Sequence, residues 1–135
     1  MARTGVLFLL WALTGCATVG YQPTPPGPGV PTISAFRIEP RVVRVGQEAT
    51  LSFHYEDGDA DITEAYLREA ELRDFSYVFW LQSTPLDVSA HLGQVAGIVE
   101  VRLKWDSEGI RLYEVYVVDR KGNKSNRLRA SVTVQ

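Results

Sequence analysis

The chain is poor in cysteine and histidine. It has 135 residues and a single cysteine, Cys16, which excludes an intramolecular disulfide and any metal site built from several cysteines. His54 and His91 are the only histidines, which argues against a zinc centre. The formal net charge is only -2, so we expect no nucleic-acid partner.

The N-terminal segment has an apolar run that is too short to cross a membrane. The run "VLFLLWAL" covers residues 6–13, whereas a membrane-spanning helix needs about 20 residues. Its length is typical of the apolar region of a secretory signal peptide, and Arg3 supplies the preceding positive charge. The sequence therefore predicts a signal peptide over residues 1–15.

Four residues at the end of this segment follow a known pattern: Leu13, Thr14, Gly15 and Cys16. They resemble the lipobox of bacterial lipoproteins, which is an aliphatic residue, a small residue, Gly or Ala, and then Cys. The resemblance implies that Cys16 is diacylated on its sulfur, that the chain is cut before it, and that the new amino terminus is acylated. Two or more acyl chains hold a protein at a membrane stably, so the expected cofactor is covalent lipid on Cys16. An uncleaved signal or a buried cysteine is the alternative.

The resemblance also bears on location. In enterobacterial lipoproteins an Asp directly after the cysteine favours retention in the inner membrane, and here that residue is Ala17. The resemblance therefore implies an anchor in the outer membrane of a bacterial cell envelope.

A proline-rich stretch separates Cys16 from the rest of the chain. Residues 16–31 hold five of the seven prolines, at positions 23, 25, 26, 28 and 31. Proline favours extended polyproline II, so we expect a semi-rigid tether with a reach of roughly 45 Å at about 3.1 Å per residue. The "PTPP" within it also fits the P-x-x-P pattern of ligands for proline-binding grooves.

Residues 32–135 carry the alternating pattern of half-buried strands. Apolar residues occur at every second position in "ATLSFHY", "VEVRLKW", "YEVYVVD" and "RLRASVTV", and turn signals such as "EDGD", "DSEG" and "DRKGN" separate the runs. "ISAFRIEP" predicts an earlier strand, which "RVVRVG" continues after a break. About seven short strands in one domain predict an all-β, antiparallel β-sandwich.

Two stretches carry a second resemblance. "VGQEATLSFHYED" and "YEVYVVDRKGNKSN" are similar to a strand and a closing hairpin of bacterial immunoglobulin-like and fibronectin type III-like domains. The resemblance implies an immunoglobulin-like sandwich over residues 32–135. Within it, residues 62–73 are rich in helix formers, and they predict either a long strand or a short inserted helix.

Three carboxylates lie in the turn "EDGDADIT". Asp57, Asp59 and Asp61 alternate, and such oxygens are calcium candidates. The EF-hand template fails, because Ile62 stands where it needs glycine and Arg68 where it needs glutamate. A looser calcium loop and an ordinary Asp-Gly turn both remain compatible with the sequence.

Catalytic motifs are missing. Ser52 and His54 share a strand face, but nothing in the sequence adds an oriented acid or an oxyanion hole, so we expect no enzyme activity. The expected function is a non-catalytic binding or structural role in the envelope, with membrane lipid and an envelope protein as partners. The alternative is a carbohydrate- or peptidoglycan-binding module, which needs exposed aromatics; the candidates are Tyr77, Trp80 and Trp105.

Overall fold

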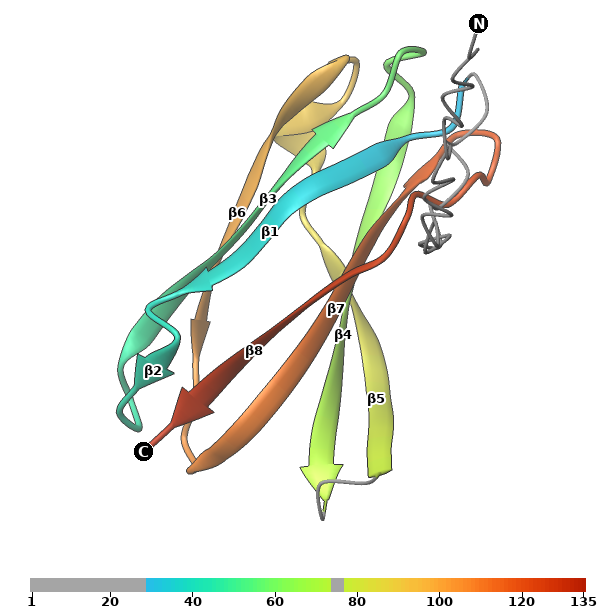
Figure 1. The fold of residues 1–135 in the computed structure, drawn as a ribbon. Helices are drawn as coiled ribbons and strands as arrows, with labels where there is room; N and C mark the ends of the chain where they lie inside the picture. The colour runs from blue at the N-terminus through green and yellow to red at the C-terminus, as the bar shows by residue number, and fades with distance from the viewer. Residues whose placement is uncertain (1–28, 74–76) are drawn as a thin grey trace, which may run out of the picture.

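The computed structural model describes residues 29–73 and 77–135, and this part of the chain is a sandwich of two β-sheets (Figure 1). The strands are β1 (Thr32–Glu39), β2 (Val42–Val43), β3 (Glu48–Glu56), β4 (Ile62–Arg73), β5 (Tyr77–Leu86), β6 (Ala96–Lys104), β7 (Gly109–Asp119) and β8 (Leu128–Val134). A 3-10 turn, η1 (Ser89–His91), precedes β6. The predicted all-β, immunoglobulin-like sandwich is confirmed. No helix among the described residues is long and apolar enough to cross a membrane.

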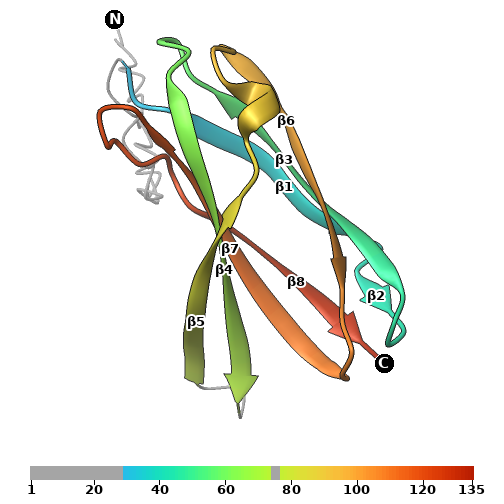
Figure 2. The same ribbon diagram turned by 180° about the vertical axis from the view of Figure 1, so that it is seen from behind.

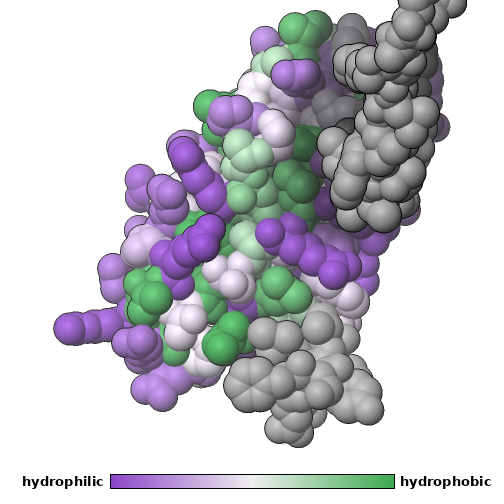
Figure 3. Space-filling model, viewed as in Figure 1, coloured by the Kyte–Doolittle hydropathy of each residue, from purple (hydrophilic) through white to green (hydrophobic). Residues whose placement is uncertain are grey.

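The two sheets differ in size. One has three strands in the order β1-β3-β6, and the other has five in the order β2-β8-β7-β4-β5. All neighbours pair antiparallel except β2 and β8, which pair parallel. β1 packs beside β8 on one side of the sandwich. On the face seen from that side, hydrophilic residues surround small groups of apolar ones (Figure 3).

The core lies between the sheets and follows the predicted alternation. Leu51, Phe53 and Tyr55 of β3 are buried, whereas His54 between them is exposed. In β7 the apolar residues at odd positions join the same core, and in β8 Val132 and Val134 do so. The period of two therefore gave the inward face of each of these strands correctly.

The sequence "RVVRVG" does not continue the first strand. After Pro40 the chain changes sheets, and β2 pairs with the C-terminal strand, Val42 opposite Thr133 and Val43 opposite Val134. The prediction of a continued strand is wrong because alternation identifies the buried residue, here Val43, but does not say in which sheet it lies.

The helix alternative for residues 62–73 is also wrong, because this segment is the strand β4. It pairs with β7 on one edge and β5 on the other, so its backbone is satisfied on both sides. Ala65 and Leu67 face the core, and Ala70 is buried on the opposite face. Helix propensity is a weak preference, and burial of both faces in the middle of a sheet overrides it.

The hairpin between β7 and β8 shows why its sequence is specific. Asp119 accepts two hydrogen bonds from Asn123, one from the backbone and one from the side-chain amide, both at 2.8 Å. Asn126 exchanges two hydrogen bonds with the backbone of Ile33 and so ties the hairpin to β1. Gly122 has a φ of 86°, which favours glycine. The tripeptide "NKS" is therefore part of a structured turn.

Candidate functional site

A cleft opens between the edge strands β5 and β6, on the side of the sandwich away from β1 and β8. Its volume is about 600 Å³. Figure 2 shows this side, where the lower parts of β4 and β5 diverge from β6. The cleft exists because a three-stranded sheet does not cover all of a five-stranded one.

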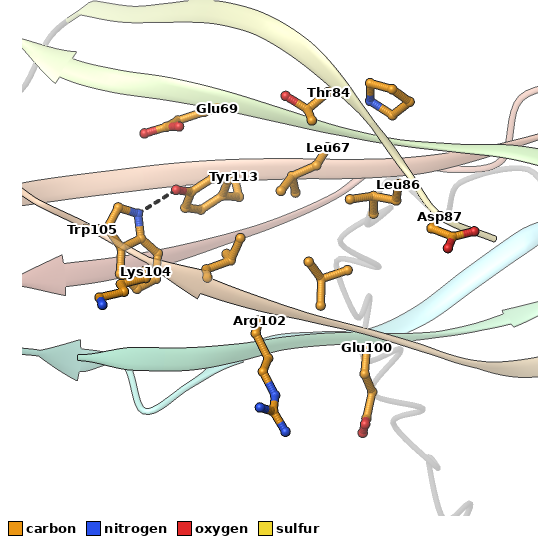
Figure 4. A pocket seen from close by; sticks show the side chains of 13 residues that line it. Leu67, Glu69, Thr84, Leu86, Asp87, Glu100, Arg102, Lys104, Trp105 and Tyr113 are labelled. Atoms are coloured by element: carbon orange, nitrogen blue, oxygen red, sulfur yellow. Dashed lines mark hydrogen bonds between the residues drawn. The ribbon is translucent and has the colours of Figure 1, made fainter. Parts of the chain in front are cut away.

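The cleft is lined by apolar and polar residues in about equal share, and the two kinds occupy different places. Leu67, Leu86 and Tyr113 point toward its middle, whereas Glu100 and Arg102 point away from it (Figure 4). Val101 and Leu103 lie on the inward face of β6 but are only half-buried. Inward-facing aliphatic side chains that stay partly exposed mark a region where the core is not closed.

Trp105 and Tyr113 close one end of the cleft. The indole Nε1 of Trp105 donates a hydrogen bond of 2.7 Å to the Tyr113 hydroxyl (Figure 4). Both side chains are buried, with Trp105 7% and Tyr113 3% exposed. Burial raises the pKa of Tyr113 to about 12, so its hydroxyl stays neutral at physiological pH.

Polar groups beside this end form a small ion-pair network. Arg111 lies 3.6 Å from the Glu69 carboxylate and donates a hydrogen bond of 2.7 Å to the Ser107 hydroxyl. Among the described residues that line the cleft there is no histidine, cysteine or serine. The cleft therefore combines aliphatic side chains in its floor with charged side chains at its borders.

Alternation along the chain does not reveal this cleft. It puts Val101 and Leu103 on a buried face, but it does not tell that their own strand, β6, is the last one of its sheet. Edge strands are hard to read from a single sequence; the proline at position 85 is the signal that β5 lies at an edge.

The two candidates for an aromatic platform whose side chains the structure describes, Trp80 and Trp105, do not lie on a common exposed face. Trp105 belongs to the core, so its assignment to an exposed platform is wrong. Trp80 is half-buried on the outer face of the five-stranded sheet, and the guanidinium groups of Arg68 and Arg129 each lie 5.0 Å from its ring centroid. The side chain of Tyr77 lies outside the described residues.

A cluster of cations surrounds one buried acid on this outer face. Glu114 is 2% exposed, and it accepts hydrogen bonds from Arg129 Nε at 3.0 Å, Arg127 Nη1 at 3.2 Å and Arg68 Nη1 at 3.3 Å. We call these four residues the Glu114 cluster. The guanidinium carbon of Arg127 also lies 4.9 Å from the ring centroid of the neighbouring Tyr116. Arginine thus occupies ring surfaces on which a sugar would have to stack.

The three calcium candidates do come together. Ligand atoms of Asp57, Asp59 and Asp61 lie within 4.8 Å of one another. Asp57 is buried, and its two oxygens accept hydrogen bonds from the backbone N–H groups of Asp59 at 3.2 Å and Asp61 at 2.9 Å. Lys121 lies 3.6 Å from the Asp59 carboxylate. These hydrogen bonds are the ones that an aspartate makes in an ordinary Asp-Gly turn, which is one of the two interpretations that the sequence allows.

One carboxylate of this group, that of Asp61, has an environment that disfavours its charged form. Asp61 Oδ1 is buried without a hydrogen-bond partner among the described residues. Burial, a hydrogen bond with Asp57 and the charges of Asp57, Asp119 and Asp59 all raise the pKa of Asp61. The acidic group therefore costs stability at neutral pH unless a cation offsets it.

Ser52 and His54 do not form a catalytic pair. Ser52 is buried, and its hydroxyl accepts a hydrogen bond from Arg37 Nε at 3.2 Å, whereas His54 faces solvent. His91 instead contacts the buried Tyr55, whose hydroxyl lies 3.1 Å from its Nδ1. Neither histidine lines the cleft.

Comparisons with known proteins support the fold. No protein-family model and no curated protein sequence matches the chain. Among solved structures, the sporulation control protein Spo0M from Bacillus subtilis is similar with a TM-score of 0.51 at 11% identity, over 79% of this chain and 50% of that one. The PKD domain of an M14-like peptidase from a Thermoplasmatales archaeon is similar with a TM-score of 0.48 at 18% identity. The match covers 79% of this chain and 94% of that one. The CARDB domain of a Pyrococcus furiosus protein, in complex with di-metal ions, is similar with a TM-score of 0.44 at 16% identity. The match covers 77% of this chain and 91% of that one. At these identities the likeness concerns architecture alone.

Proposed function

We propose that this chain is a bacterial envelope lipoprotein whose immunoglobulin-like domain binds another envelope protein. In this proposal residues 1–15 are removed, Cys16 carries the lipid, and residues 16–31 hold the domain away from the outer membrane. The domain has a non-catalytic role, either as an accessory subunit or in holding a complex together.

The observation that carries the binding role is the open cleft between β5 and β6. Its volume is about 600 Å³, and its floor contains the half-buried aliphatic side chains of Val101 and Leu103. A soluble domain gains stability by closing such a region, so leaving it open is a cost that a bound partner would offset. Aliphatic side chains with a few polar groups around them are typical of a binding site, which supports this role.

The anchor is supported by the sequence pattern around Cys16. All four positions of the lipobox pattern are matched by residues 13–16, and an apolar run precedes them. Several acyl chains together give stable attachment. The carbohydrate-binding alternative has less support, because Trp105 is buried in the core and two arginines lie against the ring of Trp80.

Membrane fractionation with mild crosslinking tests the proposal. The wild-type chain should sediment with membranes and crosslink to an envelope protein, whereas Cys16→Ala should appear in the soluble fraction. Thr14→Ser is the matched control, because it keeps a small residue in the lipobox and should remain in the membrane fraction. A Cys16→Ala chain that still sediments with membranes would contradict the anchor.

A further inference from the structure

The three-stranded sheet ends at β6, and one more strand beside β6 would lie over the open cleft. We propose that β6 accepts an extended segment of the partner protein as a fourth strand of the β1-β3-β6 sheet. This inference rests on the proposed function, because it says how that partner is bound. It also says what the bound segment must look like.

The backbone of β6 presents unpaired groups at its free edge. Asp57 donates its N–H to the Val95 carbonyl at 2.7 Å, and the register with β3 is unbroken from Ala96 to Lys104. Backbone groups in an antiparallel pair alternate in direction along the strand. The odd-numbered residues of β6 therefore bond to β3, and the even-numbered ones direct N–H and C=O away from it.

Beyond Ala96 at the start of the strand, these outward-directed groups belong to Ile98, Glu100, Arg102 and Lys104. In the described part of the chain β6 pairs only with β3, and no backbone hydrogen bond outside the ladder reaches these four residues. Unpaired strand edges are templates for pairing with another chain. Main-chain pairing of this kind is how added strands gain affinity, while side-chain pockets supply specificity.

The facing edge, β5, is less suited to pairing. It carries Pro85, which has no N–H to donate, and proline is a common means of blocking an edge strand. β6 contains no proline between Ala96 and Lys104. Of the two strands that border the cleft, β6 is therefore the one that can extend its sheet.

The side chains of β6 define the chemistry of the segment. Val101 and Leu103 face the cleft, whereas Glu100, Arg102 and Lys104 lie on the exposed outer face. Lys104 is directly opposite Glu48 of β3, but Arg102 is opposite Thr50 and has no acid beside it in that pair. A fitting segment alternates apolar residues, which enter the cleft, with polar ones, and it places an acidic residue opposite Arg102.

A fatty acyl chain would fill the same floor less completely. It would cover the apolar side chains but would leave the outward N–H and C=O groups of β6 without partners in a region it had dehydrated. An extended polypeptide satisfies both requirements. The occupant to which the geometry points is therefore a strand of a protein partner.

Amide hydrogen exchange of the full chain, in detergent, tests the proposal directly. The probe is a short capped peptide in which valine alternates with threonine and glutamate occupies the central polar position. It should slow exchange at the amides of Ile98, Glu100, Arg102 and Lys104. The odd-numbered amides of β6 should change little, because β3 already protects them. Binding without this even-numbered pattern would overturn the proposal.

Matched peptides test the side-chain requirements. A peptide with lysine in place of the central glutamate should bind about tenfold more weakly. A peptide of unchanged composition with its valines grouped together should not protect the edge, because alternation is lost. Equal binding of all three peptides would contradict the proposal, as would binding of laurate that leaves the even-numbered amides exchanging freely.

Variants of Arg102 separate charge from the backbone. Arg102→Gln should weaken binding a fewfold, in a salt-dependent manner, and Arg102→Pro should weaken it about tenfold or more by also removing an outward N–H. Arg120→Gln, an equal charge change on an exposed hairpin residue, is the control and should bind as wild type. Far-UV circular dichroism and thermal unfolding establish that each variant is folded.

The outcomes separate this inference from the proposed function. If the chain crosslinks to an envelope protein in membranes but Arg102→Pro crosslinks equally well, the binding role stands and the β6 edge is the wrong site. If Cys16→Ala stays with membranes while the peptide still protects the even-numbered amides, the anchor fails and the edge site stands.

Discussion

Glu114 provides the sharpest test of how the outer face of the five-stranded sheet is held together. It lies directly opposite Arg68 of β4 and Arg129 of β8, so a single carboxylate links three strands. Replacing it with glutamine keeps the volume but removes the charge that holds three guanidinium groups. The arginines then repel one another across the site that the carboxylate occupied.

The magnitude follows from how exposed the partners are. Removing one partner of a fully buried ion pair costs about 3–5 kcal/mol. Here the side chains of Arg68, Arg127 and Arg129 are 26%, 44% and 60% exposed, so each can rehydrate once the carboxylate is lost. We therefore expect Glu114→Gln to lower the free energy of unfolding by about 1–3 kcal/mol.

The reverse substitution should behave differently. Arg129→Gln leaves Glu114 with two hydrogen-bonded arginines, and the lost partner is the most exposed of the three, so the expected cost is under about 1 kcal/mol. Urea unfolding followed by tryptophan fluorescence measures both variants. Equal effects, or a Glu114→Gln chain as stable as wild type, would refute the view that one buried acid organises this face.

Three further predictions concern the turns and the core. A Cβ at Gly97 would lie 2.6–2.9 Å from the hydroxyl oxygen and two ring carbons of the buried Tyr55. Gly97→Ala should therefore lower the free energy of unfolding in urea by about 1–3 kcal/mol. Gly58→Ala is the control and should cost little, because no other atom lies within 4 Å of the added Cβ. Because burial and nearby carboxylates raise the pKa of Asp61, its contribution to stability is present at low pH and lost as pH rises through the folded value. Asp61→Asn should therefore raise Tm at about pH 7 and not at about pH 3; a lower Tm at pH 7 would contradict this. Because two backbone N–H groups already bond to Asp57, added calcium should leave Tm unchanged, and a saturable rise would instead establish a calcium site.

Alternation along the chain was sufficient to predict most strands and their buried faces. Leu51, Phe53 and Tyr55 lie in the core as predicted, and the even positions of β6 are exposed. The same pattern could not assign strands to sheets, because strands of both sheets bury one face in the same core and therefore show the same alternation. For that reason the crossing of β2 to the larger sheet was missed.

The candidate site depends on features that the sequence hides. The cleft results from the unequal width of the sheets, which is a property of long-range pairing. Alternation in "VEVRLKW" puts Trp105 on the apolar face with Val101 and Leu103, and its burial agrees with that pattern, whereas its hydrogen bond to Tyr113 could not be predicted. The Glu114 cluster was hidden for a similar reason, since Arg68 of β4 is 46 residues away from Glu114 in the sequence.

The proposal of a lipid-anchored envelope protein is tested most directly by the intact mass of the chain isolated from its native membrane. The predicted chain begins at Cys16, lacks residues 1–15, and carries the added mass of acyl groups on that residue. Alkaline or enzymatic release of the ester-linked acyl chains should lower the mass accordingly. A chain that retains Met1, or one that begins at Cys16 with an unmodified thiol, would contradict the proposal.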